Sequence, residues 1–257
     1  MRLPVWGTVR QAWAVLFDDL PAFLKAALVP FLLLAYASYV DLTGGTDGGS
    51  VAAMFADTLA FLLLSFSWYR RRLLPADGHR PPVLRCFALY LLYSVVLLLV
   101  LTGLAVLFWV SIGMGAQLMM ETGPSHDVLV LAVVVPVVAL TIAFHLFFYG
   151  RFILVFPSLA IGAGVTLRAS WFLMSGNVWR LMATCVLAAL PPLSVGFLCA
   201  TLFEVEAATA SSLSVGVIAS LQAMASVFGI AVFTGVAAMA FRTIYDRLTL
   251  PLLAPMS

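Results

Sequence analysis

Side chains that could do chemistry are sparse, because only 9% of the 257 residues are charged. Two of the candidates, Asp57 and His145, lie within long apolar segments. An ionisable group in a membrane segment is costly and is a functional hypothesis by default. Asp57 could bind a cation or a proton, or it could simply be stabilised by a nearby helix N-terminus and by water. His145 could bind a haem if a second histidine faced it, whereas a lone histidine is usually a hydrogen-bonded packing residue.

A hydrolytic triad would need a serine, a histidine and an acid in mutual contact. Ser170 and His145 are predicted near one side of a membrane and Asp57 near the other, so the sequence predicts no such triad and no enzymatic activity. The cysteines are widely spaced and predict neither a disulfide framework nor a metal cage: Cys86, Cys185 and Cys199. Thioethers beside an imidazole could attract a soft metal, although such methionines usually just pack: Met114, Met119, Met120 and His126. We therefore predict no metal and no cofactor.

The elements that position these residues follow from composition, since 64% of the chain is hydrophobic. A helix needs about 20 apolar residues to cross roughly 30 Å of hydrocarbon. The sequence therefore predicts an all-α polytopic integral membrane protein whose residues 1–257 form a single membrane domain. Six transmembrane helices are expected near Ala22–Val40, Val51–Tyr69, Cys86–Ile112, Val128–Tyr149, Leu181–Phe203 and Leu213–Phe241.

Basic residues gather on one side of this topology. They are Arg2 and Arg10 before the first span; Arg70, Arg71, Arg72, Arg80 and Arg85 after the second; Arg151, Arg168 and Arg180 after the fourth; and Arg242 and Arg247 after the sixth. The opposite connections contain no Lys or Arg and carry acidic residues instead: Asp41, Asp47, Glu121, Asp127, Glu204 and Glu206. Cytoplasmic flanks carry the excess of Lys and Arg, so we expect a bacterial inner-membrane protein with both termini in the cytoplasm.

Tryptophan placement agrees with these boundaries, because indole rings favour the membrane–water interface. All six tryptophans fall at predicted span ends or beside them: Trp6, Trp13, Trp68, Trp109, Trp171 and Trp179. Residues 152–167 are also apolar, but a crossing there would break the charge asymmetry. We expect that segment to lie along, or dip into, the cytoplasmic face.

Two amphipathic helices are predicted at the cytoplasmic face, over residues 6–19 and 164–175. The first has one apolar stripe, typical of a helix lying flat on a membrane: Trp6, Val9, Trp13, Leu16, Phe17 and Leu20. Asp19 is expected to cap the next helix and Pro21 to open it. The second helix is followed by a turn at Gly176-Asn177.

These two units share a spacing, Arg10-x-x-Trp13-x5-Asp19 against Arg168-x-x-Trp171-x5-Asn177. Each leads from the predicted cytoplasmic face into an outward-going span. Either an internal duplication or chance similarity between apolar segments accounts for the match.

The segment between the fourth and fifth predicted spans holds a further spaced set: Arg151, Pro157, Leu167, Ser170-Trp171, Gly176-Asn177 and Trp179-Arg180. This set resembles the signature of the bacterial glycerophosphoryl diester phosphodiesterase membrane domain family. The predicted N-terminal helix and first span are similar to that family's opening as well. The chain departs from the family at Ile161-Gly162-Ala163-Gly164, Ala169 and Ser175, where relatives are more charged. A charge-dependent role of this element in the family would therefore lack those charged residues in this chain.

The family takes its name from a soluble, metal-dependent barrel that is attached in some members. Nothing in this sequence encodes the His and acidic ligands of such a barrel. The resemblance thus implies a membrane domain and no phosphodiesterase activity.

Two functions from different classes remain. The basic loop and surface helices predict a non-enzymatic protein that engages anionic lipid, or a partner protein, since each near-surface cation contributes about 1 kcal/mol to anionic-membrane binding. The same arginines are equally explained by topology alone. The alternative is a transporter or channel for a small or lipid-like solute, with Pro136 and Pro191-Pro192 as candidate helix breaks. No nucleic-acid partner is expected. A small-residue face at Gly216, Ser220 and Ala223 could pack against a helix of this chain or of a second copy.

Overall fold

The computed structural model describes residues 3–44, 47–74, 81–120, 135–206 and 212–253, and all the regular elements in those ranges are helices. They are α1 (Val5–Asp18), α2 (Leu20–Leu42), α3 (Asp47–Leu73), α4 (Val83–Met120), α6 (Val135–Phe152), α7 (Val155–Ile161), α8 (Leu167–Leu173), α9 (Val178–Glu206) and α10 (Ser212–Leu253).

Six helices are long and apolar enough to span a membrane, which confirms the predicted fold class. The candidate spans are Leu20–Leu42, Gly49–Leu73, Val83–Val106, Val135–Ile161, Val178–Phe203 and Leu213–Tyr245. The start of the predicted fourth span, residues 128–134, lies outside the described residues.

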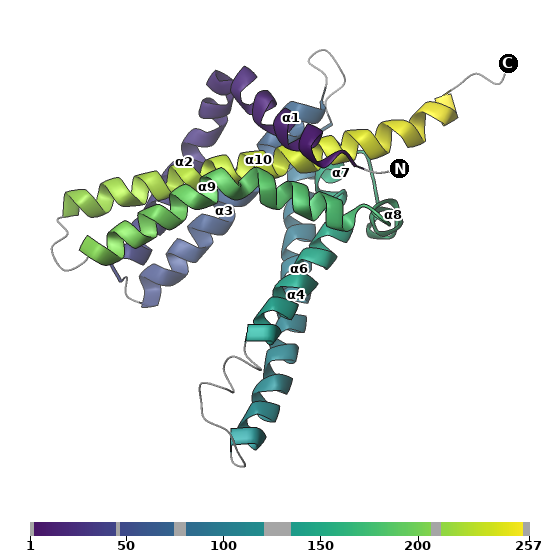
Figure 1. The fold of residues 1–257 in the computed structure, drawn as a ribbon. Coiled ribbons are helices and arrows are strands. Elements are labelled where there is room, and N and C mark those ends of the chain that lie inside the picture. Colours follow the sequence, from purple (N-terminus) through teal and green to yellow (C-terminus); the bar gives the residue numbers. More distant parts are fainter. Residues whose placement is uncertain (1–2, 45–46, 75–80, 121–134, 207–211, 254–257) are drawn as a thin grey trace.

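Helices α2, α3, α9 and α10 form a four-helix group with α10 at its centre, because α10 contacts each of the other three (Figure 1). The last turns of α2 and α9 and the first turns of α3 and α10 lie toward one end of this group, which we call the distal end (Figure 1). Both chain termini lie toward the opposite, basal end, where α1, α7 and α8 gather (Figure 1). Helices α4 and α6 point away from the four-helix group (Figure 1), and α7 contacts both α3 and α4 at the junction.

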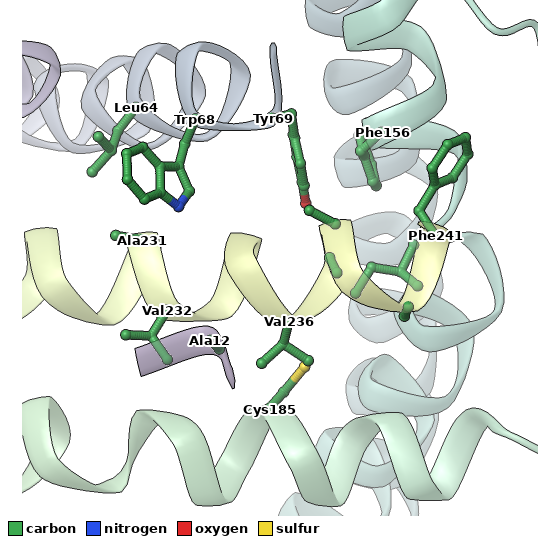
Figure 2. Packing of buried hydrophobic residues seen from close by; sticks show 14 of the residues in the cluster. Ala12, Leu64, Trp68, Tyr69, Phe156, Cys185, Ala231, Val232, Val236 and Phe241 are labelled. Atoms are coloured by element: carbon green, nitrogen blue, oxygen red, sulfur yellow. The ribbon is translucent and has the colours of Figure 1, made fainter. Parts of the chain in front are cut away.

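Small side chains allow α10 to pack closely at the centre. Ala231, Val236 and Ala237 are at most 1% exposed. Figure 2 shows Ala231 facing Trp68 of α3, while Val236 meets Cys185 of α9 on another side. A helix that is apolar on all sides is expected to be buried, and α10 has the most buried span of the six.

Proline and glycine set several helix boundaries. Pro136 lies in the first turn of α6, where its missing N–H removes no helical bond. Gly162 ends α7 with a φ of 71°, and Gly176 forms the predicted turn before α9 with a φ of 79°. The sequence allowed a helix break at Pro191-Pro192, but α9 continues through both prolines.

Both segments predicted at the cytoplasmic face pack partly against other helices. The buried face of α1 carries Thr8, Ala12 and Leu16 and packs on α9 and α10. Of the predicted apolar stripe, Leu16 is buried, Val9, Trp13 and Leu20 pack half-buried against the core, and Trp6 and Phe17 are exposed. The segment expected at the surface contains α7, whose residues are mostly buried between α3, α4 and α10, followed by the short helix α8.

Candidate functional site

A cavity of 1080 Å³ lies between the four-helix group and α4. Side chains of α3, α4, α9 and α10 line its walls, and Tyr149 of α6 and Phe156 of α7 contribute to its basal end. The cavity exists because α4 diverges from α9 and α10 toward the distal end (Figure 1). Most of the wall is apolar, with α9 supplying Pro192, Leu193 and Phe197.

The polar part of the wall lies toward the distal end. Asp57 and Gln222 each follow the first residue of their helix, α3 or α10, by ten positions. At a rise of about 1.5 Å per residue, both lie roughly 15 Å from the distal end of their helix. Ser226 lies one turn further along α10, and Thr58 adjoins Asp57. The carboxyl and amide side chains of the wall therefore lie toward the distal end, whereas apolar and aromatic side chains line the cavity throughout.

The hydrogen-bonding state of these groups differs. The side-chain oxygen of Gln222 is buried and has no hydrogen-bond partner among the described residues. Thr58 donates to the Met54 carbonyl at 2.9 Å. In the described part of the chain the ion pair found is Asp19 with Arg71, so Asp57 has no cationic partner there. Among the described residues, the buried oxygen of Gln222 thus has no hydrogen-bond partner, and Asp57 has no cation paired with it.

The basal arginines mostly bond within the protein. Arg70 donates to the carbonyls of Ala160 at 2.9 Å and Pro81 at 3.0 Å, and so joins α3 to the end of α7 and to the start of α4. Arg72 donates to the Val15 carbonyl, and its guanidinium lies 4.3 Å from the Trp68 ring centroid. These two arginines hold α1, α3 and α7 together.

Arg151 joins α6 to α8. Its guanidinium donates to the Trp171 carbonyl at 2.9 Å and lies 4.8 Å from the Trp171 ring centroid and 5.1 Å from that of Phe147. The buried Ser170 hydroxyl donates back to the Arg151 carbonyl at 2.7 Å. Arg151, Ser170 and Trp171 therefore form one reciprocal contact between the two helices.

Asp19 occupies the predicted cap position before α2, but its side chain accepts no helix N–H. It accepts two hydrogen bonds from Arg71 instead, at 2.7 and 2.9 Å. The hydrogen bond from Arg71 is the main cause that lowers the pKa of the Asp19 carboxyl. Asp19 thus links α1 and α2 to the basal end of α3.

The turn before α9 anchors the N-terminal segment. Leu3 N–H donates to the side-chain oxygen of the buried Asn177 at 3.1 Å, and Arg180 donates to the Leu3 carbonyl at 3.5 Å. Trp179 is 60% exposed. Trp13 is half-buried and stacks on Phe17, with ring centroids 5.8 Å apart. The residues of the predicted surface-helix motif therefore fall into two groups. Some, such as Asn177, are buried and hydrogen-bond to another segment, whereas others, such as Trp179, are exposed aromatic residues.

Some basic residues stay exposed: Arg10, Arg85, Arg168 and Arg242. A second, small cavity of 120 Å³ is lined in part by Arg72, Arg242, Gln11 and Thr243. The Arg72 Nε is buried without a hydrogen-bond partner among the described residues. Arg80 lies outside the described residues, as do His126 and the side chains of Met114, Met119 and Met120.

The remaining predicted site residues lie away from the large cavity. The His145 Nδ1 is 2.8 Å from the Thr141 carbonyl on its own helix. Ser220 donates to the Gly216 carbonyl at 2.8 Å, and a Cβ at Gly216 would meet nothing within 4 Å, whereas Ala223 is fully buried in the core. Close packing on this face therefore occurs at Ala223. In the described ranges no group of three or more His, Cys, Asp or Glu side chains could hold a metal ion.

Sequence reasoning identified Asp57 but missed Gln222 and Ser226. The available signal was the stripe Gln222, Ser226, Gly229 and Phe233 on α10, which repeats at helical spacing and lines the cavity.

No protein-family model, curated protein or solved structure matches this chain. The resemblance to the glycerophosphoryl diester phosphodiesterase membrane domain family therefore stays a prediction.

Proposed function

We propose that this membrane-embedded helical protein binds a lipid-like amphiphile in the large cavity, without enzymatic conversion, as a carrier or transporter of that molecule. The observation that carries the proposal is the 1080 Å³ cavity in a protein with six membrane-length helices. Typical small-molecule pockets measure about 300–1,000 Å³ and are mostly apolar with a few placed polar groups. This cavity matches that description at the upper end of the size range.

An amphiphile fits the distribution of polarity better than a fully polar solute does. A polar solute would face Leu193 and Phe197 of α9 with its hydrogen bonds unmade, and an unpaired buried polar group costs about 1–3 kcal/mol. An apolar chain meets those side chains without that cost. Its polar group then pairs with the side chains near the distal end.

Binding without catalysis agrees with the positions of the candidate triad residues. The Ser170 hydroxyl donates to the Arg151 carbonyl, and the His145 ring nitrogen lies by the Thr141 carbonyl. Neither group has the other as its hydrogen-bond partner. Asp57 lines the cavity, whereas Ser170 and His145 do not.

Filling the cavity tests the proposal. Gly196 lines the cavity, and a Cβ at this position would meet nothing within 4 Å. We expect Gly196→Trp to fold normally and to lower the amount of co-purified amphiphile about tenfold, because the indole would occupy the space of the chain. Native mass spectrometry of gently extracted protein measures that amount.

Gly103→Trp is the matched control. Gly103 also has open space around its Cα, but it lies on α4 outside the cavity lining. The control should retain amphiphile as the parent protein does. Equal retention by the parent protein and by Gly196→Trp would contradict the proposal.

A second candidate function is contact between the basal face and anionic lipids of the cytoplasmic leaflet. It requires a bacterial inner membrane with both termini in the cytoplasm, as the arginine distribution predicts. The observation that favours it is the exposure of Arg10, Arg85, Arg168 and Arg242, the last of which also lines the small cavity. The internal bonds of Arg70, Arg71 and Arg72 assign those residues to structure.

Replacing two exposed arginines tests this second function. We expect Arg10→Gln with Arg168→Gln to weaken binding to vesicles of phosphatidylglycerol by about tenfold or more, since each near-surface cation contributes about 1 kcal/mol. The protein would be inserted in nanodiscs of neutral lipid, and sedimentation with the vesicles would be measured. Lys25→Gln, on an exposed residue one turn inside α2, is the control. Unchanged sedimentation of the double variant would contradict this function.

A further inference from the structure

We infer that the polar end of the amphiphile carries N–H donors, as a primary ammonium does, and that Asp57 and Gln222 hold it in the distal half of the large cavity. This inference rests on the proposed binding of an amphiphile and names the chemical class of its head group.

One side-chain oxygen in the cavity lining, that of Gln222, has no hydrogen-bond partner among the described residues. This side-chain oxygen is buried in a residue that lines the cavity, and the described residues offer it no donor. Leaving a buried acceptor unpaired costs about 1–3 kcal/mol, so most such groups in proteins have partners. This oxygen is itself closed off from the cavity, so a donor on the ligand recovers that free energy when the Gln222 side chain turns toward the cavity.

The charge of the cavity lining favours a cationic head group. Asp57 is the sole acidic residue in the described lining of the cavity, and that lining contains no Lys, Arg or His. A carboxylate accepts hydrogen bonds and donates none. An anionic head group would find no cation there and would meet a like charge, whereas an ammonium would gain both a charge partner and a hydrogen-bond acceptor.

The carboxyl and amide side chains of the lining lie toward the distal end of the cavity. Asp57 and Gln222 each lie ten residues from the distal end of their own helix, and these two helices, α3 and α10, pack against each other. Thr58 and Ser226 add hydroxyls beside them. The basal end of the cavity offers aromatic rings from Tyr149, Phe156 and Phe233 and no carboxyl or amide side chain. The head group therefore lies in the distal half and the hydrocarbon extends toward the basal end.

The experiment compares head groups that differ in their donors. The full-length protein would be equilibrated in nanodiscs with equal amounts of phosphatidylethanolamine, phosphatidylcholine and phosphatidylglycerol of identical acyl chains. Retained lipids would then be counted by native mass spectrometry. Ethanolamine has N–H donors and choline has none at the same net charge. We expect phosphatidylethanolamine to be enriched about fivefold over phosphatidylcholine, in line with one or two hydrogen bonds.

Variants assign the preference to the two residues. Asp57→Asn and Gln222→Leu should each remove most of the enrichment, and Asp57→Glu, which keeps the carboxyl, should retain it. The controls are Asp18→Asn, at an exposed acid at the end of α1, and Gln11→Leu, at an exposed amide on α1, neither of which lines the large cavity. Both controls should bind lipid as the parent does.

Enrichment of phosphatidylcholine or phosphatidylglycerol, or an ethanolamine preference that survives both Asp57→Asn and Gln222→Leu, would overturn the inference. These results differ from failure of the proposed function. In that case no lipid is retained, or Gly196→Trp retains as much as Gly103→Trp.

Discussion

Replacing Trp68 with alanine is expected to lower the free energy of unfolding by about 3 kcal/mol, the usual scale for truncating a buried large aromatic side chain. Trp68 is 1% exposed and points from α3 toward Ala231 of α10 (Figure 2). Its ring packs edge-on against the Phe23 ring, with centroids 5.3 Å apart. The Arg72 guanidinium lies 4.3 Å from the Trp68 ring centroid. The truncation therefore opens a void and removes an aromatic contact and a cation–π contact together.

Trp6→Ala serves as the matched control, because Trp6 is 72% exposed on α1. We expect this change to alter the free energy of unfolding by no more than about 0.5 kcal/mol. Equilibrium unfolding by sodium dodecyl sulfate in mixed micelles measures both variants. If the two losses were equal, the packing of α3 against α2 and α10 described here would be wrong.

Replacing Arg151 with methionine is expected to cost about 3 kcal/mol of unfolding free energy. Methionine keeps much of the hydrocarbon stem but removes the hydrogen bond to the Trp171 carbonyl and the contacts with the rings of Trp171 and Phe147. A hydrogen bond from a charged donor contributes about 1.5–3 kcal/mol and a cation–π contact about 0.5–2 kcal/mol. The contact between α6 and α8 should be weakened more than the other helix contacts.

Arg168→Met is the control on α8 itself. Arg168 is exposed, and its guanidinium lies 6.0 Å from the Phe172 ring centroid, at the edge of a useful cation–π distance. We expect a change within about 0.5 kcal/mol. Hydrogen exchange of α8 amides should rise in Arg151→Met and stay at the parent rate in Arg168→Met. Equal exchange rates in the two variants would contradict the structural role of Arg151.

The six spans were predictable from sequence because each is a long apolar run, and the membrane requirement for about 20 such residues leaves little choice of boundary. Helix α7 was not predictable in the same way. Its seven residues are too few for a periodic signal, and Pro157 within them argues against a helix. Its burial follows from contacts with α3, α4 and α10, which lie far away in the sequence.

The arginines show a similar limit. Their placement in the sequence follows the positive-inside pattern, but that pattern does not distinguish an exposed guanidinium from a bonded one. Arg70 and Arg151 find carbonyl acceptors on elements that are distant along the chain or across a turn. Arg168, two positions before the buried Ser170, stays exposed because it lies on the other side of the short helix α8.

The cavity could not be derived from the sequence, because it arises from the angle between α4 and the four-helix group (Figure 1). Helical periodicity gives the faces of a helix but not the direction in which the helix leaves its neighbours. Asp57 attracted notice as a rare acid in a span, whereas Gln222 is uncharged and its unpaired oxygen is apparent only in the structure.

The most direct test of amphiphile binding is a cryo-electron microscopy map of the protein in lipid nanodiscs, with an antibody fragment bound for size. We expect one elongated density in the large cavity. The head group of the bound molecule should lie within about 3 Å of Asp57 and Gln222, the distance of an ordinary hydrogen bond. Its tail should extend toward Tyr149 and Phe156. A cavity without such density, or one closed by packing of α4 against α9, would contradict the account.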